Sequence, residues 1–198
     1  MKVALLDYGV GNLHSLVKAL ELGGADVSIE ADAMRALRAD ALVLPGVGAF
    51  GAAAERLGPA AESIRDALDD GLPCLGICLG MQLLFEASEE GDGRGIGMFS
   101  GTVRRLTARR VPHMGWNQVE ASADSLFAGS DNLIAYYAHS FVALPSASAD
   151  VIAWTEYEGT RFPAAVRRNR TWGVQFHPEK SDVAGVRILQ NFLREAGQ

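Results

Sequence analysis

The stretch Gly76-Ile77-Cys78-Leu79-Gly80-Met81-Gln82 follows a short apolar run and precedes a segment with helical periodicity. A cysteine with a glycine two residues away on each side is typical of the cysteine form of a nucleophile elbow. The turn from strand to helix is sharp, so side chains at the two glycine positions would crowd each other. Partial positive charge at the N-terminus of the helix favours the thiolate. We therefore expect Cys78 to be a nucleophile, although as an isolated residue it would be interpreted as a core cysteine.

The segment Gln175-Phe176-His177-Pro178-Glu179, near the other end of the chain, supplies a base and a carboxylate. Pro178 favours an extended conformation of the residue before it, which predicts that His177 and Glu179 lie on the same side of the chain. Glu179 can then hold the tautomer of His177 and stabilise its charged form. His177 can take the proton of Cys78 and later protonate the leaving group. The sequence thus predicts a Cys78–His177–Glu179 triad, whereas a lone histidine at a strand end would be structural.

Stabilisation of an oxyanion requires further N–H donors, and Pro45-Gly46-Val47-Gly48 is a candidate source of one. This stretch follows an apolar run that we expect to form a parallel strand ending at the same sheet edge as Cys78. Its glycines permit unusual backbone angles, so the amide of Val47 can point into the site. The amide of Leu79, directly after the nucleophile, is the second expected donor. The alternative is an ordinary turn at the end of a strand.

Composition and charge exclude several classes of protein. The 198 residues, 48% of them hydrophobic and 21% charged, predict one globular domain over residues 1–198. A net charge of −6 argues against a nucleic-acid-binding surface. No run of about 18 apolar residues indicates a membrane span, so we expect a cytoplasmic protein. One basic cluster is either solvated charge or a local patch for a phosphorylated ligand or an acidic partner, and it consists of Arg104, Arg105, Arg109 and Arg110.

We expect neither a metal ion nor a cofactor. Cys74 and Cys78 are too close for a disulfide clamp and lack a second pair of zinc ligands, and Cys74 is interpreted as core packing. The stretch Gly9-Val10-Gly11 resembles the start of a dinucleotide-binding fingerprint, but His14 stands where the third glycine belongs. The glycine-rich segment 91–95 follows a helix rather than a strand, so it is not a phosphate loop either.

Short apolar runs alternate with helical patterns through the first half of the chain. The apolar runs are 3–6, 27–29, 41–44 and 74–77, and the helical patterns cover 13–20, 33–37, two Ala-rich stretches separated at Gly58-Pro59, and the segment after Cys78 through about Ala87. This alternation predicts an α/β fold with a parallel sheet covered on both faces. In the second half we expect antiparallel additions to the same sheet at 102–106, 117–119, 133–137, 151–157, 164–167 and 172–176, and a final helix over 183–195.

Together the elbow and the His177-Pro178-Glu179 motif resemble the class I (triad) glutamine amidotransferases over essentially the whole chain. More narrowly, the chain resembles the glutaminase subunits of imidazole glycerol phosphate synthase, an enzyme of histidine biosynthesis. This narrower resemblance is carried by Asp7-Tyr8-Gly9-Val10-Gly11-Asn12-Leu13, Pro45-Gly46-Val47-Gly48-Ala49-Phe50, Pro112-His113-Met114-Gly115-Trp116-Asn117, Tyr136-Tyr137-Ala138-His139-Ser140-Phe141 and Lys180-Ser181.

The resemblance implies a flavodoxin-like three-layer α/β fold, with a mixed, mostly parallel sheet and antiparallel additions in the C-terminal half. It also implies hydrolysis of L-glutamine to glutamate and ammonia through a thioester on Cys78. Gly48 and Gln82 are then expected to bind the substrate. The backbone around Ser140 and Phe141 is expected to hold the α-amino and α-carboxylate groups of glutamine.

The glutaminase pattern occupies all 198 residues, so we expect another chain to use the ammonia. The resemblance implies a heterodimer with a (β/α)8-barrel cyclase subunit, and it places Trp116, Asn117, Tyr137 and Lys180 at the contact. One alternative is a glutaminase that serves another ammonia-dependent synthase, which should lack the 112–117 and Lys180-Ser181 signatures. Another is a binding or regulatory protein on the same fold, which would require the loss of a triad residue.

Overall fold

The computed structural model describes residues 1–9, 11, 13–130 and 132–198; Val10 and Asn12 of the quoted N-terminal stretch lie outside the described residues. Within the described ranges, an eight-stranded sheet has the order β2-β1-β3-β4-β13-β12-β11-β8. The strands β2, β1, β3, β4 and β13 are parallel to their neighbours in this group, and the remaining three are antiparallel. Their bounds in sheet order are Asp26–Glu30, Lys2–Leu6, Ala41–Leu44, Cys74–Ile77, Thr171–Val174, Thr160–Arg168, Val151–Tyr157 and Glu120–Ala121.

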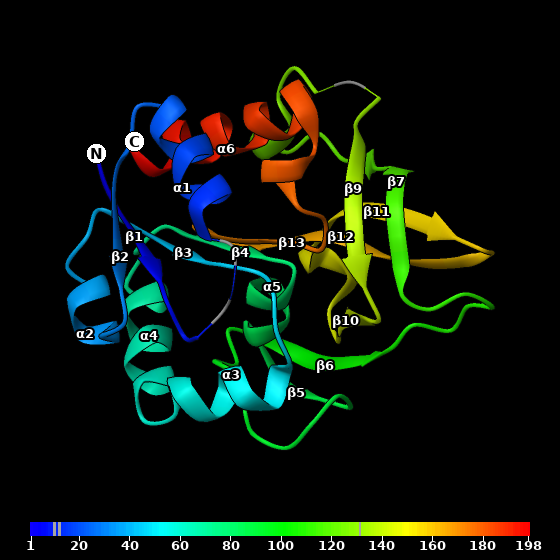
Figure 1. The fold of residues 1–198 in the computed structure, drawn as a ribbon, viewed down its shortest axis with the longest axis horizontal. Helices are drawn as coiled ribbons and strands as arrows, with labels where there is room; N and C mark the ends of the chain where they lie inside the picture. The colour runs from blue at the N-terminus through cyan, green and yellow to red at the C-terminus, as the bar shows by residue number, and fades with distance from the viewer. Residues whose placement is uncertain (10, 12, 131) are drawn as a thin grey trace.

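Helices cover both faces of this sheet (Figure 1). One face carries α1 (Leu13–Leu22) and α6 (Asp182–Ala196), and the other carries α2 (Ala33–Ala36), α3 (Phe50–Leu57), α4 (Ala60–Asp69) and α5 (Leu79–Leu83). Successive strand residues point to opposite faces, so Val3 and Leu5 join one apolar cluster while Ala4 and Leu6 join the other. The mixed, mostly parallel α/β sheet predicted from the sequence is therefore confirmed.

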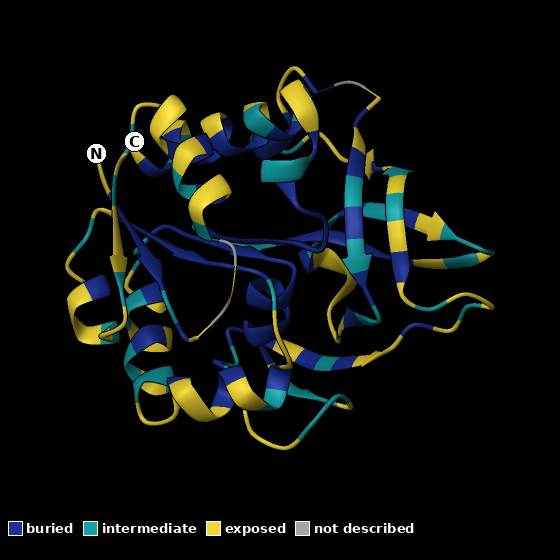
Figure 2. Ribbon diagram, in the orientation of Figure 1, coloured by how far each residue is buried: buried dark blue, intermediate teal, exposed yellow. Residues whose placement is uncertain are grey.

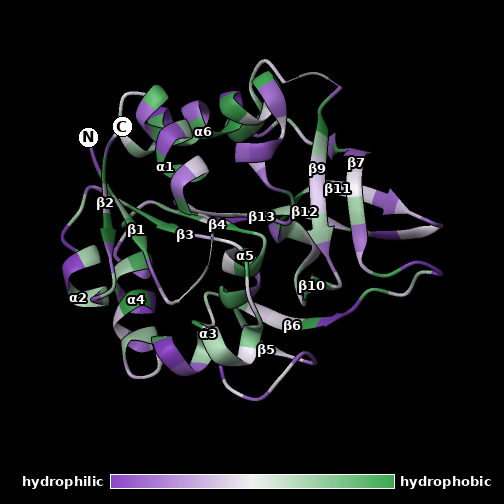
Figure 3. Cartoon of the chain, in the orientation of Figure 1, coloured by the Kyte–Doolittle hydropathy of each residue, from purple (hydrophilic) through white to green (hydrophobic). Residues whose placement is uncertain are grey.

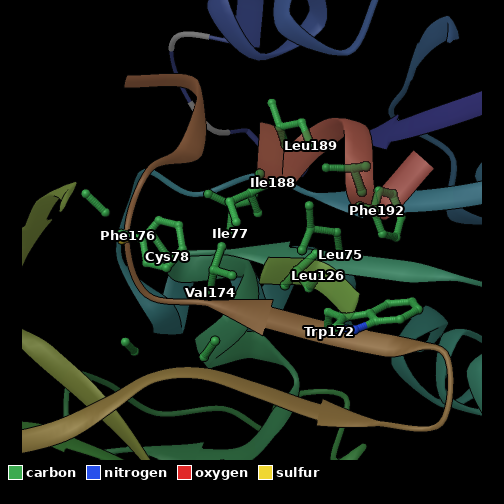
Figure 4. Packing of buried hydrophobic residues seen from close by; sticks show 14 of the residues in the cluster. Leu75, Ile77, Cys78, Leu126, Trp172, Val174, Phe176, Ile188, Leu189 and Phe192 are labelled. Atoms are coloured by element: carbon green, nitrogen blue, oxygen red, sulfur yellow. The ribbon is translucent and has the colours of Figure 1, made fainter. Parts of the chain in front are cut away.

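The central strands are buried along their whole length, whereas the outer faces of the helices are exposed and polar (Figures 2 and 3). On the α6 side, Ile188, Leu189 and Phe192 lie over the side chains of β4 and β13 (Figure 4). The rings of Trp172 and Phe192 meet edge to face with their centroids 5.8 Å apart. Each such buried side chain contributes about 2 kcal/mol of hydrophobic free energy. This packing holds the ends of β4 and β13 in place.

The second half of the chain differs from the expected set of antiparallel additions. Strand β13 pairs parallel with β4, and only β12, β11 and β8 extend the main sheet antiparallel. Strand β6 (Phe99–Arg105) instead joins β5 (Phe85–Ser88) and β10 (Phe141–Pro145) in a three-stranded sheet, while β7 (His113–Gln118) and β9 (Ile134–His139) form a two-stranded ribbon. The apolar runs alone did not distinguish one sheet from three.

The helix after Cys78 was expected to continue through about Ala87, and that expectation is wrong. Helix α5 ends at Leu83, and Phe85 begins β5, where its ring stacks on Phe99 with centroids 5.4 Å apart. The interruption at Gly58-Pro59 between α3 and α4 and the final helix are both present. The described ranges also contain three short 3-10 turns, namely η1 (Ser125–Phe127), η2 (Ser148–Asp150) and η3 (Pro178–Lys180). Among the described residues, no helix is long and apolar enough to cross a membrane.

Candidate active site

Cys78 occupies a strained turn between β4 and α5. Its backbone has φ +50° and ψ −104°, in a region that residues other than glycine rarely adopt. A Cβ atom on Gly76 would lie 2.7 Å from the Gly80 carbonyl oxygen, so the first half of the expected crowding is present. A Cβ atom on Gly80 would instead lie 2.0 Å from the Leu44 oxygen. Gly80 is therefore required by the approach of β3, a reason that the local sequence did not reveal.

The segment after β3 presses against the elbow. Strands β3 and β4 are parallel, so Pro45 and Gly46 leave the sheet at the same edge as Cys78. A Cβ atom on Gly46 would lie 2.2 Å from the Ile77 oxygen and 2.8 Å from the Cβ atom of Cys78. The hydroxyl of Tyr8 donates a hydrogen bond to the Pro45 carbonyl. This close approach distinguishes the segment from an ordinary strand-end turn and brings Val47 beside the nucleophile.

His177 reaches the same edge because β13 is the parallel neighbour of β4. Val174 lies opposite Ile77, so the chain after β13 passes beside Cys78. His177 itself is extended, at φ −101° and ψ 95°, but η3 follows it directly. The His177 Nδ1 atom lies 2.9 Å from Oε1 of Glu179. The pair thus meets across a 3-10 turn rather than along a fully extended segment.

The surroundings of His177 favour its charged form. Burial by itself lowers the pKa of His177, but the neighbouring Cys78 sulfur and the Glu179 carboxylate raise it to about 10. The Nε2 atom is buried without a hydrogen-bond partner in the described part of the chain. Catalytic hydrogen bonds are commonly long in the absence of substrate. The arrangement is therefore that of an imidazolium held between a carboxylate and a sulfur.

A cleft of about 220 Å³ opens beside Cys78. It brings together the expected nucleophile, oxyanion donors and substrate-binding residues, which are Cys78, Val47, Leu79, Gly48, Gln82, Ser140 and Phe141. Its lining also includes Gly46, Glu90, Pro112, Ala138 and His139. His177, Glu179 and Lys180 line a smaller cavity on the other side of the 45–47 segment. The cleft is thus open to a ligand on the side of Cys78, with the base behind the nucleophile.

Glu90 also belongs to the site, although no motif in the sequence predicted it. It follows β5 in the chain, is half-buried and lines the cleft. Its Oε2 atom accepts a hydrogen bond of 2.8 Å from the backbone N–H of Phe50. A carboxylate beside the cleft can attract a cationic group of a ligand. No local pattern could have identified it, because its partner lies forty positions earlier in the chain.

Two of the histidines are buried, and one of them, His139, lines the cleft. His113 Nδ1 and His139 Nε2 are 3.1 Å apart, and His139 Nδ1 donates to the Phe141 carbonyl at 2.9 Å. The His113 ring stacks between Tyr137 and Tyr157, with centroids 4.7 Å and 4.0 Å away. Burial lowers the pKa of His113 to about 4 and that of His139 to about 3. The pair is therefore neutral and connects the cleft lining to strand β7.

The residues expected at a partner contact divide between surface and core. Trp116 is exposed on β7, and Asn117 is half-buried with its Nδ2 donating to the Glu156 carbonyl at 2.8 Å. Lys180 is half-buried, with its Nζ atom 5.8 Å from the centre of the Tyr136 ring. Tyr137, in contrast, is fully buried, and its hydroxyl lies 2.6 Å from Oγ1 of Thr155. Its placement at a contact was wrong, because alternation along β9 turns it inward.

No group of three potential metal-ligating side chains gathers anywhere in the described residues. Most of the basic cluster is engaged with carboxylates or an aromatic ring. Arg110 lies 3.1 Å from Glu158, Arg104 lies 3.8 Å from Glu89, and Arg105 stands over the Phe141 ring at 6.0 Å.

Comparisons with known proteins agree with this architecture. Residues 4–196 match the family described as glutamine amidotransferase class-I. The chain is 48% identical to the imidazole glycerol phosphate synthase subunit HisH of Thermococcus kodakarensis, over 97% of this chain and 99% of that one. It is 46% identical to the subunit of the same name from Halobacterium salinarum, over 96% and 92%.

Solved structures share the fold at low sequence identity. A crystal structure of a glutamine amidotransferase covers 99% of both chains with a TM-score of 0.79 and 19% identity. The structure of PurLQS from Thermotoga maritima covers 98% of this chain and 97% of the matched chain, with a TM-score of 0.73 and 19% identity. The flavodoxin-like arrangement expected from the sequence is thus shared with these structures.

Proposed function

The chain belongs to the class I glutamine amidotransferase family and, within it, to the HisH subunits of imidazole glycerol phosphate synthase, and we propose that Cys78, His177 and Glu179 perform its glutamine hydrolysis. The reaction supplies nitrogen for histidine biosynthesis. One observation supports the triad above all others: the parallel strands β4 and β13 deliver Cys78 and His177 to one sheet edge. Glu179 then stands 2.9 Å from the far nitrogen of the imidazole.

The raised pKa of His177 favours its imidazolium form, and we propose that Cys78 reacts as the thiolate. The Cys78 sulfur attacks the side-chain amide carbon of glutamine, and the carbonyl oxygen becomes an oxyanion between the N–H groups of Val47 and Leu79. Collapse of this intermediate breaks the C–N bond, and His177 donates its proton to the departing ammonia. Neutral His177 then takes a proton from water, whose oxygen attacks the thioester. Release of glutamate restores the thiolate and the imidazolium.

The cleft offers complementary groups for one amino-acid substrate. We assign Gln82, Gly48 and the backbone of Ser140 and Phe141 to glutamine binding, because all of them line the cleft beside Cys78. Glu90 adds the negative charge that an α-ammonium group requires, and one of its oxygens is already held by the Phe50 amide. A pocket of this size with a few convergent polar groups is typical of a small-ligand site.

We further propose that the β7–β9 ribbon contacts the (β/α)8-barrel cyclase subunit in a heterodimer. Met114, Trp116 and Ile134 expose 63%, 51% and 55% of their surface on this ribbon. Large exposed apolar side chains in one place are typical of a protein-binding surface. Tyr136, whose ring lies 5.9 Å from that of Trp116, replaces Tyr137 in the proposed contact, together with Lys180 and the partly exposed Asn117.

Ammonia release from glutamine tests this function. The purified chain is assayed alone and with the cyclase subunit carrying its phosphorylated ribulosyl ligand, and we expect turnover to rise on addition of the loaded partner. Cys78→Ala should abolish the activity. Cys74→Ala is the matched control, because Cys74 is buried inside β4 and does not line the cleft. Full activity of Cys78→Ala would refute the triad, and turnover indifferent to the cyclase would refute the subunit assignment.

A further inference from the structure

We propose that Gln175 is a positioning residue of the glutaminase reaction, which holds the Cys78 sulfur through its amide N–H and holds Gln82 through its amide oxygen. The proposal rests on the glutaminase function proposed above. Gln175 stands two residues before His177, but the triad chemistry gives it no role. Its side chain is fully buried, and its Nε2 atom lies 3.5 Å from Sγ of Cys78.

The position of Gln175 follows from the pairing of β13 with β4. Val174 lies opposite Ile77, so the next residue along each strand is Gln175 on one side and Cys78 on the other. The Gln175 backbone N–H donates to the Ala164 carbonyl at 2.9 Å, and the Cys78 backbone N–H donates to the Val174 carbonyl at 2.7 Å. The end of β13 therefore holds the backbone of the nucleophile and, through Gln175, its sulfur.

Gln82 fixes the orientation of the Gln175 amide. The Nε2 atom of Gln82 donates to the Phe141 carbonyl at 3.0 Å and to Oε1 of Gln175 at 3.2 Å. An amide nitrogen is only a donor, so the atom of Gln175 that faces Gln82 must be its oxygen. Reversal of the Gln175 amide would set two NH₂ groups against each other in a buried site, which is unfavourable. The NH₂ group of Gln175 is therefore directed at Cys78.

An N–H donor directed at the sulfur acts on the form of Cys78 that reacts. Hydrogen bonds to an ionised acceptor are stronger than those between neutral groups, so this donor favours the thiolate over the thiol. The thiolate is the attacking species in cysteine chemistry. The same bond restrains the direction of the sulfur beside the cleft. Gln175 thus adds to the effect of His177, and both residues reach Cys78 from the end of β13.

Gln175 also determines what Gln82 can offer the substrate. A primary amide has two N–H groups, and those of Gln82 are directed at Phe141 and Gln175. The group that remains for a ligand in the cleft is the Gln82 carbonyl oxygen, an acceptor for an N–H of glutamine. Loss of the Gln175 oxygen would release Gln82 to rotate and would weaken substrate binding.

The first experiment measures alkylation of Cys78 by iodoacetamide at neutral pH, followed by peptide mass spectrometry. Gln175→Met keeps the size of the side chain and removes both polar contacts, while Gln175→Glu keeps an acceptor for Gln82 and removes the N–H. We expect both variants to react about tenfold more slowly than the unmodified chain, as befits loss of a hydrogen bond to a charged acceptor. Wild-type rates in both folded variants would overturn the proposal.

The second readout separates kcat from KM in glutamine hydrolysis with the cyclase present. Gln175→Glu should lower kcat about tenfold and leave KM within about twofold, because the contact to Gln82 persists. Gln175→Met should lower kcat and also raise KM. Equal effects of the two variants on KM would refute the role assigned to the Gln175 oxygen.

Two controls exclude a merely structural effect. Asn191→Leu removes a buried amide of α6 that donates to the carbonyls of Leu126 and Ala128, away from the cleft, and should destabilise the fold without slowing alkylation. Gln190→Met changes an exposed glutamine and should change neither the stability of the fold nor the rate of alkylation.

If the Gln175 variants do not fold, Gln82→Met tests the same network, since it frees the Gln175 amide to rotate. We expect slower alkylation there too, and an unchanged rate would overturn the proposal. Alkylation needs neither glutamine nor a partner, so failure of the proposed function would appear separately, as absence of turnover in the wild-type protein.

Discussion

The sheet edge at the ends of β4 and β13 and the β7–β9 ribbon are built in opposite ways. At the edge, Cys78 and His177 are 5% and 1% exposed and are held by backbone contacts that tolerate no added atom. On the ribbon, Trp116 exposes half of its surface, and among the described residues its ring has one aromatic contact, with Tyr136. The difference indicates that the groups at the edge are held in place within the chain itself, whereas the exposed ribbon is suited to the partner contact proposed above.

The largest loss of stability and turnover is expected from a substitution at Gly80, in the active-site edge. Gly80→Ala would place a Cβ atom 2.0 Å from the Leu44 carbonyl oxygen, which is backbone and has little freedom to move. Overpacking of this kind should cost about 3 kcal/mol of stability, and displacement of the elbow should reduce turnover strongly. Urea unfolding and ammonia release measure the two effects. Gly197→Ala is the control, because the nearest atom to its Cβ would lie at an ordinary 3.5 Å.

The buried histidines link the two regions and should make the fold sensitive to acid. Unfolded histidine has a pKa of about 6.5, while the pKa of His113 in the fold is about 4. Between these values the unfolded chain binds more protons, so the free energy of unfolding falls as the pH is lowered. Lowering the pH from 7 to 4 should cost about 3 kcal/mol through His113 alone.

Urea titrations at several pH values measure this loss. His113→Phe keeps a ring between Tyr137 and Tyr157 and should flatten the acid dependence, whatever its stability at pH 7. His14→Gln, at an exposed position of α1, should leave the dependence unchanged. An equal acid slope in His113→Phe and the wild type would contradict the assignment.

Much of the active-site edge could be predicted from the sequence, because close approach of backbones requires glycine at particular positions. Gly46, Gly76 and Gly80 stand where the ends of β3 and β4 meet the elbow, and a Cβ atom at each of them would clash with backbone. His177 and Glu179 lie two residues apart, so their pairing was visible locally. The parallel direction of β13 was not visible, since an apolar run has the same appearance in either direction.

The residues that escaped prediction depend on partners far away in the chain. Gln175 meets Cys78 and Gln82 across separations of 97 and 93 positions, and no local pattern records such contacts. Tyr137 was misplaced for a different reason. Adjacent residues of a strand face opposite sides, and a shift of one residue exchanges the inside with the outside. The pair Tyr136-Tyr137 gave no sign of which member faced inward.

The proposed partner contact of the ribbon can be weakened by mutation without changing the active-site edge. Trp116→Ala should weaken association with the cyclase subunit by about 2 kcal/mol or more, as expected for a central aromatic residue of an interface. Calorimetric titration of the two subunits measures the affinity. The rate of Cys78 alkylation in the isolated chain should stay unchanged, because Trp116 does not line the cleft.

Tyr137→Phe is the matched control on the same ribbon. It removes the hydroxyl that lies 2.6 Å from Oγ1 of Thr155, inside the protein. We expect a loss of about 1 kcal/mol of stability and unchanged affinity for the partner. Weaker binding in this variant, with full affinity in Trp116→Ala, would reverse the assignment of the two positions.

The smallest effect is expected at the basic cluster of Arg104, Arg105, Arg109 and Arg110. Arg104 and Glu89 are 3.8 Å apart, with side chains 60% and 56% exposed, and such a pair contributes less than about 0.5 kcal/mol. Arg104→Ala should therefore leave stability, turnover and partner affinity nearly unchanged. Arg168→Ala gives the contrast, because Arg168 binds the buried Asp150 at 2.6 Å and the Met98 carbonyl at 2.6 Å. A clear loss of partner affinity in Arg104→Ala would extend the proposed interface from the ribbon to β6.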